Sequence, residues 1–358
     1  MFNVAGLSLP VLSGLFVAAA VAVWVAGVSL SNTTDVLAER LHLGSALGGL
    51  ILLALATNLP EVAITVSAAL QNHLDIATGN LLGGIAIQTV VLVLLDAASR
   101  GRGVPLMSRS RSLEPALEAG LVLAVLGVCI TGTQLPDTLV FHGVAPGATF
   151  VVVTWGAGVW LLGRARSGLP WQVKAEGAQE PVPVPGEQAP GNEARERRTS
   201  TGRAALVFTV AALVTLAGGV VLEQAGEAIA GHVGLSGVLF GATVLAAATS
   251  LPEVSTGLAA MRLGNDELAI SDIFGGNAFL PVLFLPAALL SGTAVLPRAQ
   301  QSDVYLAALG LVVTAIYLFG LIFRPHRRVL GMGVDSLAVL LVYLVGLLGL
   351  VAVARQGS

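Results

Sequence analysis

The sequence predicts an all-α polytopic membrane protein in which ten transmembrane helices form two inverted-topology repeats of five helices each. Three observations predict this class. Of the 358 residues, 55% are hydrophobic and only 11% are charged, whereas a soluble domain carries roughly 25% charged residues. The apolar residues form blocks of about 20, the length that crosses a hydrocarbon core of ~30 Å. One short polar motif also occurs twice, once in each half of the chain.

The apolar blocks define the expected spans. The first is expected to be a retained membrane helix, because Met1 to Pro10 contain no Lys or Arg, and a cleaved signal peptide normally begins with a positive region. A poor signal peptide is the less favoured alternative. The expected spans are 9–30, 44–70, 75–97, 114–133, 145–163, 204–224, 236–261, 266–292, 303–323 and 332–354.

The stretch 164–203 interrupts this pattern. It is rich in Pro, Gly and charge without helical periodicity, so we expect a flexible linker between a first repeat over 1–163 and a second over 204–358. If the linker is cytoplasmic, all but two of the 18 Lys and Arg residues lie on the cytoplasmic side, the exceptions being Arg298 and Arg355. Such a bias is typical of membrane proteins. Both termini are therefore expected outside, in a bacterial-type plasma membrane.

The repeated motif reads ALATNLPEV at 54–62 and AAATSLPEV at 246–254, with seven of nine positions identical at an offset of 192 residues. Flanking acidic residues and glycine pairs match at the same offset. The two copies fall on the second and seventh spans, and an odd separation makes them cross the membrane in opposite directions. Inverted halves of this kind are typical of secondary transporters with a site near the middle of the membrane.

Each copy of the motif places a carboxylate after a proline in the middle of a span, as Pro60–Glu61 and Pro252–Glu253. A glutamate at membrane depth costs at least ~2–3 kcal/mol on insertion scales, so it indicates function. Proline also leaves carbonyl groups one turn earlier without a donor. Carboxylate, hydroxyl and carbonyl oxygens are hard ligands suited to Na⁺, Ca²⁺ or Mg²⁺. The alternative is that both glutamates are protonated and only bridge helices. The nearby polar side chains are Thr57, Asn58, Thr249 and Ser250.

The third and eighth spans supply a second polar cluster. Asn80 and Asp272 occupy equivalent positions, 19 residues after each motif glutamate. Glycine pairs in both spans are expected to let helices approach closely and to bring these residues toward the glutamates. Asp75 and Glu267 lie near span ends, where we interpret them as helix caps. The cluster also contains Gln88, Ser271 and Asn277, together with the pairs Gly83–Gly84 and Gly275–Gly276.

Other residue types do not indicate a catalytic centre. The five histidines fall at span ends or in loops without a metal-binding spacing, so we interpret them as interfacial. Cys129 is expected to be a packed thiol. No nucleotide-binding motif or nucleophile elbow is recognisable, and the basic residues form no nucleic-acid patch. We therefore expect a protein that is not an enzyme, needs no cofactor, and has inorganic cations and the lipid bilayer as partners.

These motifs resemble those of the Ca²⁺/cation antiporter superfamily, which includes the sodium/calcium exchangers. That family has two inverted repeats, each with a G-T-S-x-P-E element and a later G-N-x-x-G-S-N element. The chain has A-T-N-L-P-E at 56–61 and A-T-S-L-P-E at 248–253, followed by G-N-L-L-G-G-I at 79–85 and S-D-I-F-G-G-N at 271–277. The resemblance implies Glu61 and Glu253 as the central cation ligands, helped by Thr57, Thr249, Ser250 and the carbonyls of Ala54 and Ala246. Asn58, Asn80 and Asp272 join the candidate ligands, with Gln88, Asn277 and Ser271 as candidate supporting residues.

The chain also departs from the family pattern. Glycine replaces the serine of the second element at Gly84 and Gly276, and the polar residue expected four positions later is Gln88 in one half and Leu280 in the other. The family's sodium sites therefore do not transfer intact, and a proton becomes a candidate coupling ion because burial favours a neutral carboxyl group. Asp272 stands in place of the usual asparagine and would restore a carboxylate.

The function expected from these observations is secondary active exchange of a hard cation, foremost Ca²⁺, against Na⁺ or H⁺ by alternating access. A monovalent Na⁺/H⁺ antiporter is the first alternative. A channel and a degenerate homologue without transport activity are further alternatives. The channel would conduct without a counter-ion, and the degenerate homologue would bind cations weakly or not at all.

Overall fold

The computed structural model describes residues 6–40, 55–99, 103–136, 138–140, 145–166 and 200–356. Within these ranges the protein is all-α apart from one small hairpin, and nine helical units are long and apolar enough to cross a membrane. Each overlaps one of the expected spans. Seven units are continuous: α1 (Leu9–Arg40), α4 (Leu74–Ala98), α6 (Glu114–Thr133), α7 (Pro146–Arg166), α9 (Thr201–Val233), α15 (Gln301–Phe323) and α16 (Val334–Gln356).

The tenth expected span, 44–70, is described only in part, because residues 41–54 lie outside the described ranges. Its described portion contains a helical stretch over 55–57 and the apolar helix α3 (Leu59–Gln71). Most of the expected linker, 167–199, also lies outside the described part of the chain. At its edges α7 continues to Arg166 and α9 begins at Thr201, so both helices enter the range assigned to the linker.

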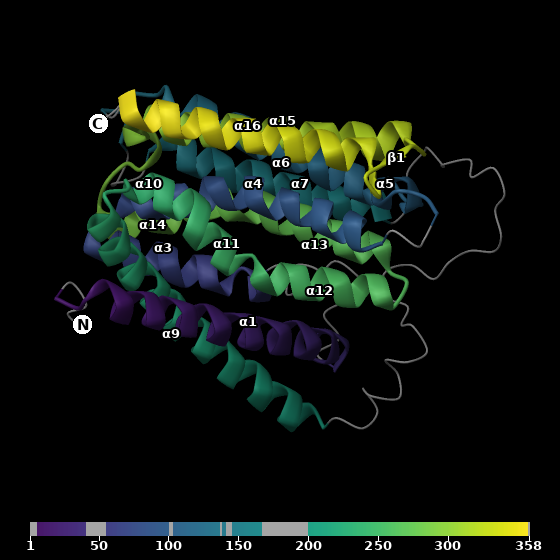
Figure 1. The fold of residues 1–358 in the computed structure, drawn as a ribbon, viewed down its shortest axis with the longest axis horizontal. Coiled ribbons are helices and arrows are strands. Elements are labelled where there is room, and N and C mark those ends of the chain that lie inside the picture. The colour runs from purple at the N-terminus through teal and green to yellow at the C-terminus, as the bar shows by residue number, and fades with distance from the viewer. Residues whose placement is uncertain are drawn as a thin grey trace.

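The long helices run roughly side by side along the long axis of the molecule (Figure 1). α15 and α16 lie at one side of the bundle, and α1 lies at the opposite side, where it packs mainly against α9. The beginning of α1 and the end of α16 lie at the same end of the bundle. Large apolar side chains such as Phe323 and Leu348 are 76% and 74% exposed, as expected for helices surrounded by lipid.

The helix that carries each motif glutamate is broken one residue before the Leu-Pro-Glu sequence. Asn58 forms a turn before α3, and Ser250 separates α11 (Ala246–Thr249) from α12 (Leu251–Arg262). Proline is favoured at the start of a helix because its missing N–H would have no partner there. Glu61 and Glu253 consequently lie in the first turns of α3 and α12. The seventh span is therefore segmented, with α10 (Gly237–Phe240) and the π-helical η2 (Gly241–Leu245) preceding α11.

Proline also interrupts the eighth span. α13 (Asp266–Phe279) passes into the 3₁₀ segment η3 (Leu280–Leu283), which contains Pro281, and then into α14 (Phe284–Ser291). A further short 3₁₀ segment, η4 (Leu296–Arg298), follows, and α5 (Leu106–Arg109) lies between α4 and α6. The strands β1 (Arg328–Val329) and β2 (Met332–Gly333) pair antiparallel just before α16, a hairpin that the sequence did not predict.

Glycine allows α4 to lie directly against η2 and α10. A Cβ added at Gly83 would lie 2.3 Å from the Cα of Ala242, and one at Gly79 would lie 2.5 Å from the Val238 carbonyl oxygen. Close helix approach at a glycine pair is thus confirmed for Gly83. The second half differs, because a Cβ at the equivalent Gly275 would meet nothing within 4 Å.

Equivalent residues of the two halves also touch. The side-chain amide of Asn277 donates to the carbonyl oxygen of Ile85 at 3.3 Å, and these residues are separated by 192 positions, the offset of the repeat. The same amide donates to Thr89 Oγ1 at 3.1 Å. Asn277 therefore joins α13 to α4 where the two halves meet.

Candidate functional site

Glu61 and Glu253 are buried near each other at the starts of α3 and α12. Their side chains are 1% and 2% exposed, and no oxygen of either carboxylate accepts a well-formed hydrogen bond from the described residues. The acidic neighbours that act on Glu253 are Glu61 and Asp272. The positive ends of α3 and α12 favour negative charge in their first turns. That effect is about 1 kcal/mol, far less than the burial of two like charges costs.

Hydroxyl groups of the second motif lie next to these carboxylates. The hydroxyl of Thr249, from the second half, lies beside the Glu61 carboxylate of the first half. The carbonyl oxygen of Ala246 accepts from the Ser250 hydroxyl at 2.7 Å, the Ser250 amide at 3.1 Å and the Thr249 hydroxyl at 3.2 Å. The donor that Pro252 removes would have bonded to the carbonyl of Ala248, four residues earlier, so the bonds to Ala246 leave the prediction of a freed carbonyl in this segment untested. A role for Ala246 as a ligand stays a prediction.

The first half contributes mainly amide and hydroxyl groups. Thr57 and Asn58 are both 1% exposed, and Asn80 is fully buried with no hydrogen-bond partner for its side-chain amide among the described residues. A Cβ added at Gly276 would lie 3.1 Å from Asn58 Nδ2 and 3.7 Å from Gln88 Oε1. Asn58 and Gln88 therefore converge on the same glycine of α13. Ala54 lies outside the described residues.

Asp272 and Ser271 lie on α13 and are 7% and 8% exposed. Asp272 Oδ2 accepts from the Thr256 hydroxyl at 2.9 Å. Sequence reasoning did not select Thr256, although its position three residues after Glu253 places it one helical turn away, next to the Glu253 side chain. Within the described ranges no three His, Cys, Asp or Glu side chains are grouped closely enough to hold a metal. A cation here would therefore complete its coordination with hydroxyl, amide and carbonyl oxygens.

The two residues interpreted as caps behave differently. Asp75 lies in the first turn of α4, but the N-cap residue is His73 and no side chain among the described residues caps this helix, so a capping role for Asp75 stays a prediction. Glu267 lies in the first turn of α13, but its carboxylate accepts from the backbone amides of Arg111 and Ser112, the latter at 2.8 Å. The cap of α13 is Asn265, whose Oδ1 accepts from the Leu268 amide at 3.0 Å. Glu267 thus joins α13 to the segment before α6.

A buried glutamate that sequence reasoning overlooked lies near the end of α9. Glu223 is fully buried and accepts from Ser67 Oγ and Gln71 Nε2, each at 2.8 Å. His73 Nδ1 lies 2.8 Å from its other oxygen, so this histidine is a direct polar partner of Glu223 as well as a residue at a span end. The sequence feature that could have identified Glu223 is its position as an acidic residue within an apolar span.

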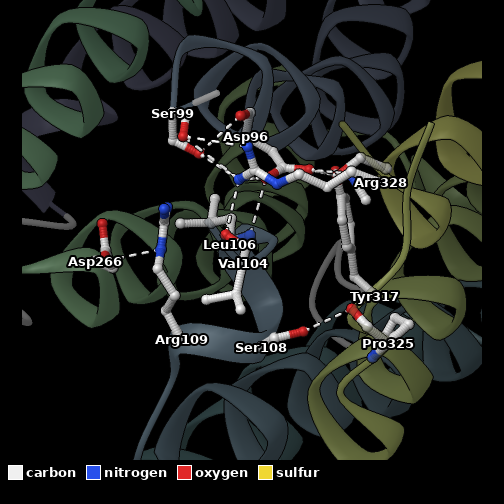
Figure 2. Close-up of polar contacts among 12 residues, drawn as sticks. Asp96, Ser99, Val104, Leu106, Ser108, Arg109, Asp266, Tyr317, Pro325 and Arg328 are labelled. Carbon is white, nitrogen blue, oxygen red and sulfur yellow. Dashed lines mark hydrogen bonds and ion pairs between the residues drawn. The ribbon is translucent and has the colours of Figure 1, made fainter. Parts of the chain in front are cut away.

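A second overlooked network lies where β1, α5 and the end of α4 meet (Figure 2). Fully buried Asp96 accepts from the amides of Leu106 at 2.8 Å and Gly333 at 2.6 Å, and lies 3.7 Å from the Arg328 guanidinium. Arg328 also donates to the carbonyl oxygen of Val104 at 2.7 Å. Alongside, Arg109 of α5 pairs with Asp266 of α13 at 3.0 Å, and Ser108 donates to the Pro325 carbonyl at 2.8 Å.

A bundle of apolar helices around two buried carboxylates is the architecture expected of a membrane transporter. The chain belongs to the sodium/calcium exchanger family, which it matches over residues 11–163 and again over 203–352. It is accordingly an integral membrane protein of a cation antiporter family.

Two curated relatives are similar over most of their length. The putative antiporter CaxA of Alkalimonas amylolytica is 26% identical over 296 residues, which cover 82% of this chain and 84% of the relative. The inner membrane protein YrbG of Escherichia coli (strain K12) is 26% identical over 289 residues, covering 78% of this chain and 80% of the relative.

Solved exchanger structures share the fold. The crystal structure of the H⁺/Ca²⁺ exchanger CAX superimposes with a TM-score of 0.68 at 12% identity, covering 96% of this chain and 85% of that one. The sodium-calcium exchanger NCX_Mj, soaked with Na⁺ and Sr²⁺, superimposes with a TM-score of 0.59 at 14% identity, covering 95% of this chain and 99% of that one. At these identities the likeness concerns the fold alone.

Proposed function

We propose that this protein is a secondary active antiporter that moves Ca²⁺ across the membrane in exchange for Na⁺ or H⁺. The observation that carries the proposal is the pair Glu61 and Glu253, two neighbouring buried carboxylates that accept no well-formed hydrogen bond from the described residues. Two such carboxylates are tolerated at membrane depth when a cation or protons neutralise them. A bound ion would therefore complete the site.

The proposed ligands surround this pair. The carboxylates of Glu61 and Glu253 hold the cation, and oxygen atoms from both halves complete its coordination. This ligand set suits hard cations because it contains only oxygen donors. The additional candidate ligands are Thr57, Asn58, Asn80, Thr249, Ser250 and the carbonyls of Ala54 and Ala246, and Asp272 contributes a further carboxylate near the site.

Alternating access follows from the arrangement of the halves. We infer two inverted repeats of five spans, over 1–163 and 204–358, joined by the linker 164–203. The contact between the equivalent residues Ile85 and Asn277, and the proximity of the equivalent Glu61 and Glu253, support a pseudo-two-fold axis through the site. Rocking of one half against the other would then expose the same cation alternately to the two sides.

The proposed orientation places both termini outside and the linker in the cytoplasm of a bacterial-type cell. The positive-inside bias supports it. The start of α1 and the end of α16 lie at one end of the bundle, while Arg109 and Arg328 belong to α5 and β1 at the other end (Figure 1).

Related proteins support calcium as the substrate. One solved structure with this fold is described as an H⁺/Ca²⁺ exchanger, and another is a sodium-calcium exchanger studied with Na⁺ and Sr²⁺ or Ca²⁺. The relative CaxA is described as a putative antiporter.

The decisive experiment is ⁴⁵Ca²⁺ uptake into proteoliposomes under an imposed Na⁺ gradient and, separately, an imposed pH gradient. Uptake under either gradient supports Ca²⁺ antiport and identifies the coupling ion. Glu61→Gln and Glu253→Gln should each abolish uptake, whereas Glu227→Gln, a change of the same chemistry in α9, should retain it. Exchange that survives both site substitutions would overturn the assignment. Pure pH-driven Na⁺ movement without Ca²⁺ uptake would identify a monovalent antiporter.

A further inference from the structure

The two halves of the candidate site differ in charge. Asp272 stands where the first half has Asn80, and Thr256 stands where it has Ile64. Ile64 is fully buried in an apolar cluster with Ala68 and Ile76. The second half therefore brings a third buried carboxylate close to the candidate site, together with a hydroxyl group at a position where the first half has an apolar side chain.

Thr256 fixes the position of this carboxylate. Its hydroxyl donates to Asp272 Oδ2 at 2.9 Å and also lies 3.2 Å from the backbone carbonyl of Glu253. The bond joins α12 to α13 one turn beyond the Glu253 side chain. Asp272 is only 7% exposed, so water screens its charge weakly.

The charge of Asp272 acts on the site. Glu253 is 2% exposed and has no hydrogen-bond partner among the described residues, and its acidic neighbours are Glu61 and Asp272. These three carboxylates are not grouped closely enough to be joint ligands of one metal ion in this conformation. Asp272 therefore influences a cation at the Glu61–Glu253 pair through space.

We propose that Asp272, positioned by Thr256, determines the preference of the site for divalent over monovalent cations. The inference rests on the proposed function of the same site. The Coulomb energy between a fixed carboxylate and a cation is proportional to the charge of the cation. Because Na⁺ and Ca²⁺ have nearly the same radius, Asp272 favours Ca²⁺ by twice the free energy that it contributes to Na⁺ at the same position.

The test measures Ca²⁺ and Na⁺ affinities of the purified full-length protein by isothermal titration calorimetry at one fixed pH. In Asp272→Asn, the fold-loss for Ca²⁺ should be the square of the fold-loss for Na⁺. A loss of about 5-fold for Na⁺ would thus accompany a loss of about 25-fold for Ca²⁺. Equal fold-losses for the two ions, or no loss, would overturn the proposal.

Further variants distinguish the effect of the Asp272 charge on cation affinity from an effect of the substitution on folding. Thr256→Val should shift the affinity ratio in the same direction, and Thr256→Ser, which keeps the hydroxyl, should restore it. The exchange Asn80→Asp with Asp272→Asn returns the charge to the equivalent position and should recover the divalent preference. Asp303→Asn removes a buried aspartate of α15 outside the site and should leave both affinities unchanged.

The outcomes also distinguish this inference from the proposed function. If the native protein binds no Ca²⁺, both are overturned. If the native protein binds and exchanges Ca²⁺ while Asp272→Asn keeps the native affinity ratio, only the role of Asp272 is overturned. If Asp272→Asn does not fold, the ratio of Ca²⁺ to Na⁺ affinity is compared between Thr256→Val and Thr256→Ser. A lower ratio in Thr256→Val supports the role of Asp272, and equal ratios overturn it.

Discussion

At the scale of single residues, burial of Glu61 and Glu253 costs free energy that the neighbouring Thr249 hydroxyl offsets only in part. Both are almost completely buried, and each lies in the first turn of a helix that begins beside the other half of the protein. An uncompensated buried charge of this kind destabilises a fold by several kcal/mol. Functional sites commonly carry such a cost, because the missing interaction is supplied by the ligand.

This cost leads to a prediction about stability. Glu61→Gln or Glu253→Gln, which keeps the shape of the side chain but removes its charge, should leave the cation-free protein at least as stable as the native one. Ca²⁺ should raise the melting temperature of the native protein, since a ligand at 100 times its Kd adds about 2.7 kcal/mol. Neither variant should show that increase.

Thermal unfolding in detergent, with Ca²⁺ and with a chelator, provides the measurement. The control is Glu227→Gln, which should retain the calcium-dependent increase. A cation-free variant that melts well below the native protein would show instead that the glutamates have a structural role.

At the scale of secondary-structure elements, equivalent glycines of the two halves have different surroundings. Gly83 of α4 lies against the backbone of η2, whereas Gly275 of α13 faces open space. The backbone of η2 cannot shift to make room for a larger residue at Gly83 as the end of a flexible side chain could. The matching sequences of the halves therefore do not imply matching packing.

Alanine substitution should reveal this difference. Gly83→Ala should lower the free energy of unfolding by about 1–3 kcal/mol, because the added methyl group overlaps Ala242. Gly275→Ala should be neutral or stabilising by up to ~1 kcal/mol, since alanine favours the helix more than glycine does. Denaturation in mixed micelles would measure both, and equal effects would contradict the packing described for α4.

The bond cluster at Glu223 joins α9 to the end of α3 and has its own prediction. Glu223→Ala should destabilise the protein by about 3 kcal/mol, because buried Ser67 and the half-buried Gln71 and His73 lose their shared partner together. Glu227→Ala, one turn further along the helix, is the matched control and should cost less. Thermal unfolding measures the loss of stability in both variants. Equal losses in the two variants would mean that the contacts of Glu223 with Ser67, Gln71 and His73 contribute little to stability.

At the scale of the whole molecule, the two ends of the bundle have different chemistry. One end holds arginine pairs and the Asp96 network around β1 and α5, and the other holds Glu223, His73 and Asp75. Arginine on the cytoplasmic side and both termini on the outer side form one consistent orientation.

Labelling of single cysteines tests this orientation. A cysteine replacing the exposed Gly6 should react with a membrane-impermeant maleimide in intact cells. A cysteine replacing the exposed Ser200, at the start of α9, should react only after the membrane is opened. Native Cys129 is 1% exposed and should stay unlabelled in both conditions. The reversed pattern would place the linker outside.

Much of this protein was predictable from local properties of the sequence. The length and hydropathy of apolar blocks determine which segments cross a membrane, because transfer into lipid depends on each segment's own composition. Nine of the expected spans coincide with helical units that are long and apolar enough to cross a membrane, and the Pro-Glu repeat identified two glutamates that are both buried. The roles of these residues in cation binding stay predictions.

Only the tertiary structure decided which buried polar groups are hydrogen-bond partners. Asp96 bonds to Gly333, 237 residues away, and Ser67 bonds to Glu223 across 156 residues. Such partners depend on how helices are placed in space, which periodicity within one segment does not encode. The placement of helices in space also determines that Thr256 bonds to Asp272 on another helix, and that Gly83 is packed against backbone while Gly275 is not. The sequence alone thus determined the class, the spans and the central carboxylates, while packing between distant segments decided the contacts that position them.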